Sequence, residues 1–177
     1  MKKTQQLGSG LINLPIFERS SLMPIARIRK LVFRPENLQL AYCEVFRGDE
    51  TRVTYVRADN LAPLNGWLTV GNEDDFGELD DYIRDHELLT KPCGLFGFRV
   101  KDTLGKNLGI VADFSLALPD FRLTRLYVKK PLWQRWRGEQ HILPKSHITD
   151  VQTDKKLIIV QPLTKPVKQA AAKAIPA

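Results

Sequence analysis

The sequence predicts an all-β protein made of two small β-barrels in tandem, joined by a short acidic, partly helical connector. Short runs of Val, Ile, Leu, Phe and Tyr are separated by turn residues, and hardly any segment keeps a helical period. The chain has 177 residues, of which 43% are apolar, so two cores are near the limit of what it can fill. Rolling a sheet into a barrel removes its exposed edges and lets about 60 to 70 residues enclose a core.

The apolar pattern of the first half of the chain recurs in the second half at a shift of 83 residues. The match continues without a gap over three expected strands. Two of its pairs are identical, and the others place one apolar residue on another. The matched pairs are Phe17 with Val100, Ile25 with Leu108, Ile28 with Val111, Leu31 with Phe114, Phe33 with Leu116, Leu38 with Phe121, Leu40 with Leu123, Cys43 with Leu126 and Val45 with Val128.

After a loop of different length, both halves end in the same kind of closing strand, Trp67–Val70 in the first and Leu157–Val160 in the second. The repeated order of elements predicts a duplicated unit. We place the first repeat at residues 11–70 and the second at residues 94–161. Residues 162–177 have no β pattern and little to bury, so we expect a flexible basic tail.

Residues 71–93 form an acidic connector between the repeats. Eight Asp and Glu residues face only two Lys and Arg there. Leu79, Tyr82 and Ile83 recur at helical spacing behind a run of acidic residues, which predicts a short amphipathic helix that bridges the two barrels. The connector is either a solvated linker or an acidic element that shields a basic face or recruits a cationic partner.

The composition indicates the compartment and the charge of the partner. The whole chain carries 27 Lys and Arg against 20 Asp and Glu, so polyanions are candidate partners. Two cysteines make no disulfide framework, and we expect Cys43 to be a small buried hydrophobe and Cys93 to be exposed but unreactive. No apolar run approaches the roughly 20 residues of a membrane-spanning helix, and no signal-peptide core is visible, so we expect a cytoplasmic protein.

The second repeat also carries a short motif. A glycine turn at Gly105 precedes the strand Gly109-Ile110-Val111-Ala112-Asp113, and the repeat later contains the apolar segment Ile142-Leu143-Pro144. Gly105 suits a turn that needs a positive φ, and Gly109 permits a close crossing of strands. This glycine hairpin, Gly-x-Val-x-Asp strand and closing proline resemble the pattern of the PRC-barrel family.

The resemblance implies a small all-β barrel that serves as a binding module. In this family such barrels occur in a ribosome small-subunit maturation factor and in the photosynthetic reaction-centre H subunit, where they act by docking. The first repeat departs from the motif, because Ala26 stands at the position of Gly109 and Lys30 at that of Asp113. In that half the likeness rests on the apolar pattern alone.

Motifs of catalysis are missing from the sequence. It has no nucleophile elbow, P-loop, dinucleotide fingerprint or paired metal ligands. His141 and His147 flank an expected strand. An enzyme would require the fold to bring distant residues such as these two and Asp113 together in a buried polar pocket. We expect these three side chains to be structural or solvated, so the sequence predicts no enzyme, metal, cofactor or small-molecule substrate.

One segment of the second repeat concentrates two of the three tryptophans with four cations. On RNA, its indole rings would stack on unpaired bases while its cations bind phosphates. The same residue types suit a protein groove, an anionic membrane surface, or a barrel cap with solvated cations. The residues that we single out for binding are Lys129, Lys130, Trp133, Arg135, Trp136 and Arg137.

From these observations we expect a binding or assembly adaptor without chemistry of its own. An RNA-linked or ribosome-linked role is the first hypothesis, because the segment combines aromatic rings with cations. Docking to a protein within a larger complex is the alternative, and an anionic membrane surface is a third candidate partner.

Overall fold

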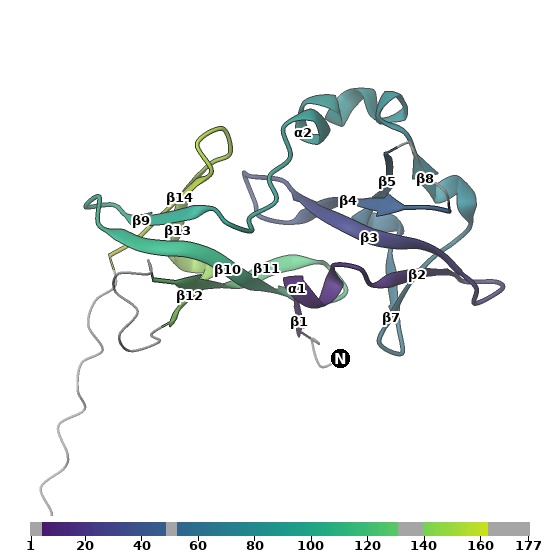
Figure 1. The fold of residues 1–177 in the computed structure, drawn as a ribbon, viewed down its shortest axis with the longest axis horizontal. Coiled ribbons are helices and arrows are strands. Elements are labelled where there is room, and N and C mark those ends of the chain that lie inside the picture. The colour runs from purple at the N-terminus through teal and green to yellow at the C-terminus, as the bar shows by residue number, and fades with distance from the viewer. Residues whose placement is uncertain (1–4, 49–52, 131–139, 163–177) are drawn as a thin grey trace, which may run out of the picture.

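The computed structural model describes residues 5–48, 53–130 and 140–162. Two seven-stranded sheets lie next to each other (Figure 1). The first is built from the first half of the chain, and the second from the second half together with residues 5–7. The strands of the first sheet are β2 (Pro15–Glu18), β3 (Pro24–Phe33), β4 (Leu40–Phe46), β5 (Thr54–Arg57), β6 (Ala62–Leu64), β7 (Trp67–Val70) and β8 (Phe76–Gly77). Those of the second are β1 (Gln5–Leu7), β9 (Arg99–Asp102), β10 (Asn107–Ala117), β11 (Arg122–Lys129), β12 (Gln140–Pro144), β13 (Ile148–Gln152) and β14 (Leu157–Val160).

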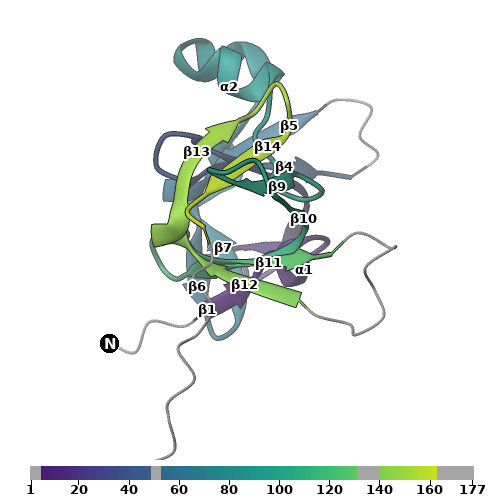
Figure 2. The ribbon, with the colours of Figure 1, turned by 90° about the vertical axis from the view of Figure 1, so that its left-hand side faces the viewer.

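The two sheets share one topology. In the first, β2 to β5 form an antiparallel meander, β7 pairs parallel to β2, and β6 pairs with β7. In the second, β9 to β12 form the antiparallel meander, β14 pairs parallel to β9, and β13 pairs with β14. The all-β class is therefore confirmed. Figure 2 shows the strands of the second sheet curving around a common axis.

The sequence predicts closed barrels, but the strand pairing does not close either sheet. In the described part of the chain, β12 has no ladder to β13, and β5 has none to β6. Short 3₁₀ turns, η1 (Ala58–Asn60) and η5 (Lys145–His147), join these strands at the corner. The chain turns there through single hydrogen bonds, Leu61 N–H to Ala58 O and Ile148 N–H to Lys145 O, in place of a ladder.

Strand registers support the shift of 83 residues in detail. Ile28 lies opposite Val45 in the first sheet, and Val111 lies opposite Val128 in the second. Each of the two central ladders has a β-bulge directly after this pair and a second one near its far end. Bulges change which face a side chain takes, so their recurrence at matching positions keeps the two cores in the same phase.

The predicted match is wrong by one residue at its start. Ile16, and not Phe17, is the counterpart of Val100, because both are fully buried and lie opposite the equivalent residues Ala26 and Gly109. The turn between β2 and β3 has one more residue than the turn between β9 and β10, so the shift is 84 before it and 83 after it. Such an insertion is hard to detect in the sequence, because neighbouring apolar residues still match one another when the two halves are aligned without a gap.

The halves meet across an approximate twofold axis. The Leu40 N–H donates to Phe121 O and the Leu123 N–H to Leu38 O, both at 3.1 Å. Phe33 and Phe114 lie edge to face in the centre, with ring centroids 5.2 Å apart. Most buried side chains of the two sheets form one continuous core, and a smaller cluster around Tyr42 lies outside it. The repeats therefore share their packing, as their small size requires.

The segment that precedes the first repeat contacts the second sheet, and the segment that precedes the second repeat contacts the first sheet. β1 pairs with β10 of the second sheet and leads into α1 (Gly8–Leu11), while Cys93, just before the second repeat, accepts a hydrogen bond from the Phe33 N–H of the first sheet. Cys93 is fully buried there, so its expected exposure is wrong. Cys43 is buried as predicted, and desolvation raises the pKa of its thiol to about 12.

The connector contains the predicted helix in part. It forms η2 (Glu73–Asp75), β8, η3 (Leu79–Asp85) and α2 (His86–Thr90), with a kink at Tyr82. Leu79, Tyr82, Leu88 and Leu89 pack on the outside of the first sheet, whereas Ile83 is 82% exposed. The connector does not lie between the two sheets as a bridge would (Figure 1). No helix within the described residues is long and apolar enough to cross a membrane.

Candidate docking face

The predicted binding segment lies mostly beyond what the structure describes. Trp133, Arg135, Trp136 and Arg137 all fall within residues 131–139, outside the described ranges. Lys129 ends β11 with its side chain exposed, and Lys130 follows it half-buried. The structure therefore shows where the segment leaves the second sheet, at the hairpin between β11 and β12.

The outward-facing side of the second sheet begins with a row of cross-strand neighbours at that hairpin. Ile110 of β10 lies opposite Arg99 of β9 on one side and Lys129 of β11 on the other, and Lys129 in turn lies opposite Gln140 of β12. Directly opposed residues project to the same side of a sheet. All four are exposed, and Ile110 keeps 48% of its surface in solvent.

A second row of neighbours continues this surface. Tyr127 lies opposite Ile142, and Arg125 lies opposite Pro144. Ile142 is 57% exposed, which is unusual for an isoleucine in a strand. We call the surface that combines an apolar centre with a cationic rim the second-sheet face, and its members are Arg99, Ile110, Arg125, Tyr127, Lys129 and Ile142.

The equivalent surface of the first sheet is covered along the second row, whereas Phe46, at the position of Lys129, is 46% exposed. Tyr42 and Tyr55 occupy the positions of Arg125 and Ile142, and they are only 1% and 7% exposed. They pack with Val32 against the connector, and the rings of Tyr42 and Tyr82 meet edge to face at 5.0 Å. The same fold position is thus core in one repeat and surface in the other.

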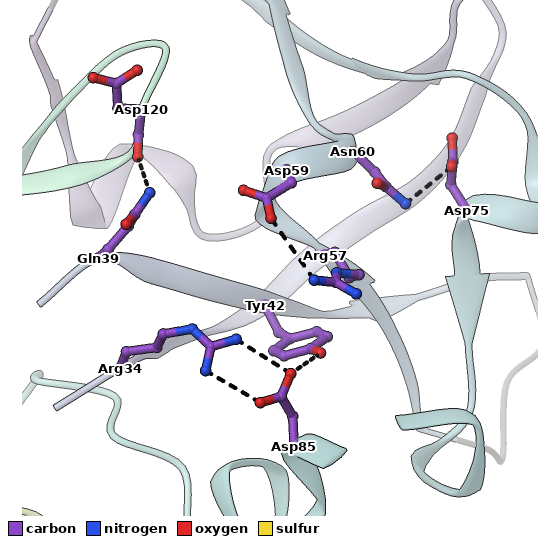
Figure 3. A network of polar contacts seen from close by, with 9 residues as sticks. All are labelled: Arg34, Gln39, Tyr42, Arg57, Asp59, Asn60, Asp75, Asp85 and Asp120. Carbon is purple, nitrogen blue, oxygen red and sulfur yellow. Dashed lines mark hydrogen bonds and ion pairs between the residues drawn. The ribbon is translucent and has the colours of Figure 1, made fainter. Parts of the chain in front are cut away.

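A polar contact fastens the connector to the first sheet (Figure 3). The Tyr42 hydroxyl donates to Asp85 Oδ2 at 2.6 Å, and the Arg34 guanidinium binds both carboxylate oxygens at 3.2 Å. The hydrogen bond from Tyr42, with the help of Arg34, holds the pKa of the Asp85 carboxyl below its usual value. Burial and the same hydrogen bond raise the pKa of the Tyr42 hydroxyl.

A buried carboxylate marks a further difference between the sheets. Glu44, at the position that Tyr127 occupies in the second sheet, is 4% exposed and is neutralised by Arg29 at 3.0 Å and Lys30 at 3.1 Å. A buried charge needs such partners to offset its desolvation. The two cations are therefore engaged within the first sheet, whereas the second sheet presents its cations at the surface.

The residues considered for chemistry do not converge. Asp113 accepts hydrogen bonds from the Ser9 and Phe114 N–H groups and from the Ser9 hydroxyl, and so fastens α1 to the second sheet. The structural interpretation of Asp113 is confirmed. Among the described residues there is no group of three or more His, Cys, Asp or Glu that could hold a metal ion.

Two hollows, each of about 360 Å³, lie away from the second-sheet face. One lies between the connector and the β13–β14 turn, and some of its charged side chains pair with each other, as Arg34 does with Asp85 and Lys91 with Glu87. The other is mainly apolar and is lined by Leu14, Trp67 and Pro119 among others. Neither joins a nucleophile to a base, so neither supports catalysis.

Sequence reasoning located the hairpin but missed the face beside it. The alternation Arg125, Tyr127, Lys129 on one side of β11 was the available signal, since period-two spacing places these side chains together. No known family model matches this chain, and no curated protein matches it.

Proposed function

We propose that this protein is a non-enzymatic docking module, a binding or assembly adaptor that contacts its partner through the second-sheet face and the adjoining basic hairpin. We further propose that its two sheets are PRC-barrel-like units in tandem. The single observation that carries the docking role is the contrast between Tyr55 at 7% exposure and Ile142 at 57% in equivalent positions. The first repeat buries this position beneath the connector, and the second leaves it exposed among the described residues.

The chemistry of the face supports binding rather than catalysis. An apolar centre with a charged rim is the usual arrangement of a protein contact surface, and Tyr and Arg are enriched among the residues that dominate binding. The face also lies on strands, so its side chains are held in place before the partner arrives. Neither of the two hollows described above is lined by a residue of the second-sheet face.

Docking is tested by photo-crosslinking in cells that make the full chain. A photoreactive benzoylphenylalanine replaces Ile142 in one variant and Leu104 in another, because Leu104 is an 82% exposed leucine in the β9–β10 turn, off the face. We expect discrete adducts from position 142 and none from position 104. Adducts from both positions, or from neither, contradict the proposal.

RNA or a ribonucleoprotein is a second candidate partner, favoured by the tryptophans and cations of residues 129–137. Its test is co-sedimentation with ribosomal subunits and total RNA over a salt series, with wild type beside a variant that has Trp133, Arg135, Trp136 and Arg137 replaced by alanine. Binding to phosphates releases counterions, so the RNA interaction predicts pelleting that falls steeply with salt and is lost in the variant. Absence of pelleting at low salt excludes this partner.

A further inference from the structure

The chain already contains one example of what fits this kind of surface. On the first sheet the connector does two things in succession. Phe76 and Gly77 form β8 and extend the sheet by pairing antiparallel with Val56 and Tyr55 at the edge strand β5. The following helical turns of η3 and α2 then fold over the outer side of the sheet, where they bury Tyr42 and Tyr55.

The second sheet offers the corresponding edge. β12 is the counterpart of β5, and Ile142 and Leu143 are the counterparts of Tyr55 and Val56. In the described residues β12 pairs only with β11, whereas β5 pairs with both β4 and β8. Figures 1 and 2 both place α2 on the opposite side of the molecule from β12. An edge strand with a free side accepts an extended segment through main-chain hydrogen bonds.

Charge indicates what kind of segment fits. The connector that covers the first sheet carries eight acidic residues against two basic ones, and one of them, Asp85, meets Arg34 and Tyr42 on that sheet. On the second sheet, Arg125 replaces Tyr42, and Lys129 adds a further exposed cation at the rim. A cationic rim selects an acidic partner and disfavours a basic one.

We propose that the second-sheet face and the outer edge of β12 bind an acidic, amphipathic segment of a partner protein, which pairs as a short strand with β12 and folds helical turns over Ile142 and Tyr127. The inference rests on the proposed function and names the partner class. The partner's segment thereby repeats on the second sheet what the connector does on the first. Its apolar side chains cover the exposed Ile110 and Ile142, and its carboxylates face Arg125 and Lys129.

The experiment uses a fluorescent synthetic peptide with the sequence of residues 72–91, added to the full chain and followed by fluorescence anisotropy. A charge control has Asp80, Asp81, Asp85 and Glu87 replaced by their amides. A strand control is methylated on the backbone nitrogens of Phe76 and Gly77, which removes the one N–H of the two that would face the neighbouring strand. The protein variants are Ile142→Asp on the face and Leu104→Asp off it, and thermal unfolding confirms that both are folded.

We expect the peptide to bind wild type and the Leu104→Asp variant within about twofold of each other, and to bind Ile142→Asp at least about tenfold more weakly. Both control peptides also bind at least about tenfold more weakly than the parent peptide. No binding of the parent peptide, or equal binding to Ile142→Asp, overturns the inference. Equal binding of the methylated peptide overturns the strand pairing.

Other occupants give separate outcomes. A 20-nucleotide poly(U) RNA that binds in place of the peptide, and that Ile142→Asp abolishes, overturns the acidic segment but leaves the docking function in place. A wild-type dimer in sedimentation analysis that Ile142→Asp dissociates assigns the face to a second copy and likewise overturns the inference. If position 142 also gives no crosslinks in cells, the proposed function itself is contradicted.

Discussion

The two repeats place the same strands in the same order, yet they differ in what lies on their outer sides. The first sheet is finished by its own connector, which adds a strand at the edge and packs Leu79, Tyr82 and Leu89 over Tyr42 and Tyr55. The second sheet keeps the topology but exposes Ile142 at the position of Tyr55. The two halves thus share one framework, and the chain between them covers only the first. The comparison shows that equivalent positions of a repeated fold can be buried in one half and exposed in the other.

The largest expected effect concerns the place where the first repeat departs from the glycine motif. Gly109 has a φ of +131°, and a Cβ there would lie 2.0 Å from Lys129 O, whereas Ala26 fills the equivalent position in the first sheet. Gly109→Ala is expected to lower the free energy of unfolding by at least about 3 kcal/mol, from strain and clash together. Ala26→Gly costs about 1 kcal/mol. Urea unfolding of both variants checks this, and equal losses contradict it.

The next effect measures the covered face against the open one. Tyr55→Ala removes a ring buried beneath the connector and is expected to cost about 2 to 3 kcal/mol. Ile142→Ala at the equivalent exposed position is expected to change the free energy of unfolding by no more than about 0.5 kcal/mol. Chemical denaturation compares the two. A large loss from Ile142→Ala would show that another part of the chain already covers the second-sheet face.

The smallest effect concerns the contact that fastens the connector. Asp85→Asn keeps the shape of the side chain but weakens the bonds from Arg34 and Tyr42, and is expected to cost about 1 to 2 kcal/mol at pH 7. The pKa of Asp85 is lowered in the folded state, so its stabilising contribution is complete above the unfolded value near 3.8. The contribution is lost as the pH falls through the lower, folded pKa.

Thermal unfolding of wild type and Asp85→Asn between pH 7 and pH 2.5 therefore gives a difference that shrinks toward acid. A difference that stays constant over this range indicates that the carboxylate charge does not hold the connector. Asp81→Asn serves as the control, because its carboxylate only caps the start of η3 through the Glu78 N–H.

Sequence reasoning recovered the all-β class and most of the repeat, because buried strand positions require apolar residues at fixed spacing. Val45 and Val128 match for this reason, and their strand registers agree. It misplaced Phe17 by one residue, since an insertion in a turn leaves alternation intact. It assumed closed barrels because a small sheet gains from losing its edges, but η1 and η5 turn the corners without a ladder.

The candidate site was harder to predict, because the solvent exposure of a side chain depends on which other elements of the fold pack against it. Nothing in the local sequence of Ile142 distinguishes it from a core strand residue. Its exposure follows from the position of the connector, which the sequence predicts to lie between the two sheets as a bridge. Cys93 shows the opposite error, since this cysteine next to a proline in the connector is buried against Phe33 at the end of β3 in the first repeat.

The exchange of leading segments between the repeats has a consequence for biosynthesis. Ser9 binds Asp113, 104 residues further along the chain, and β1 pairs with β10. When the first repeat leaves the ribosome, the strand that receives its amino-terminal segment has not yet been made. That segment has to wait for the second repeat, and contacts of such long sequence separation form slowly. The native contacts of β1 and α1 with the second sheet therefore form only after translation has passed β10.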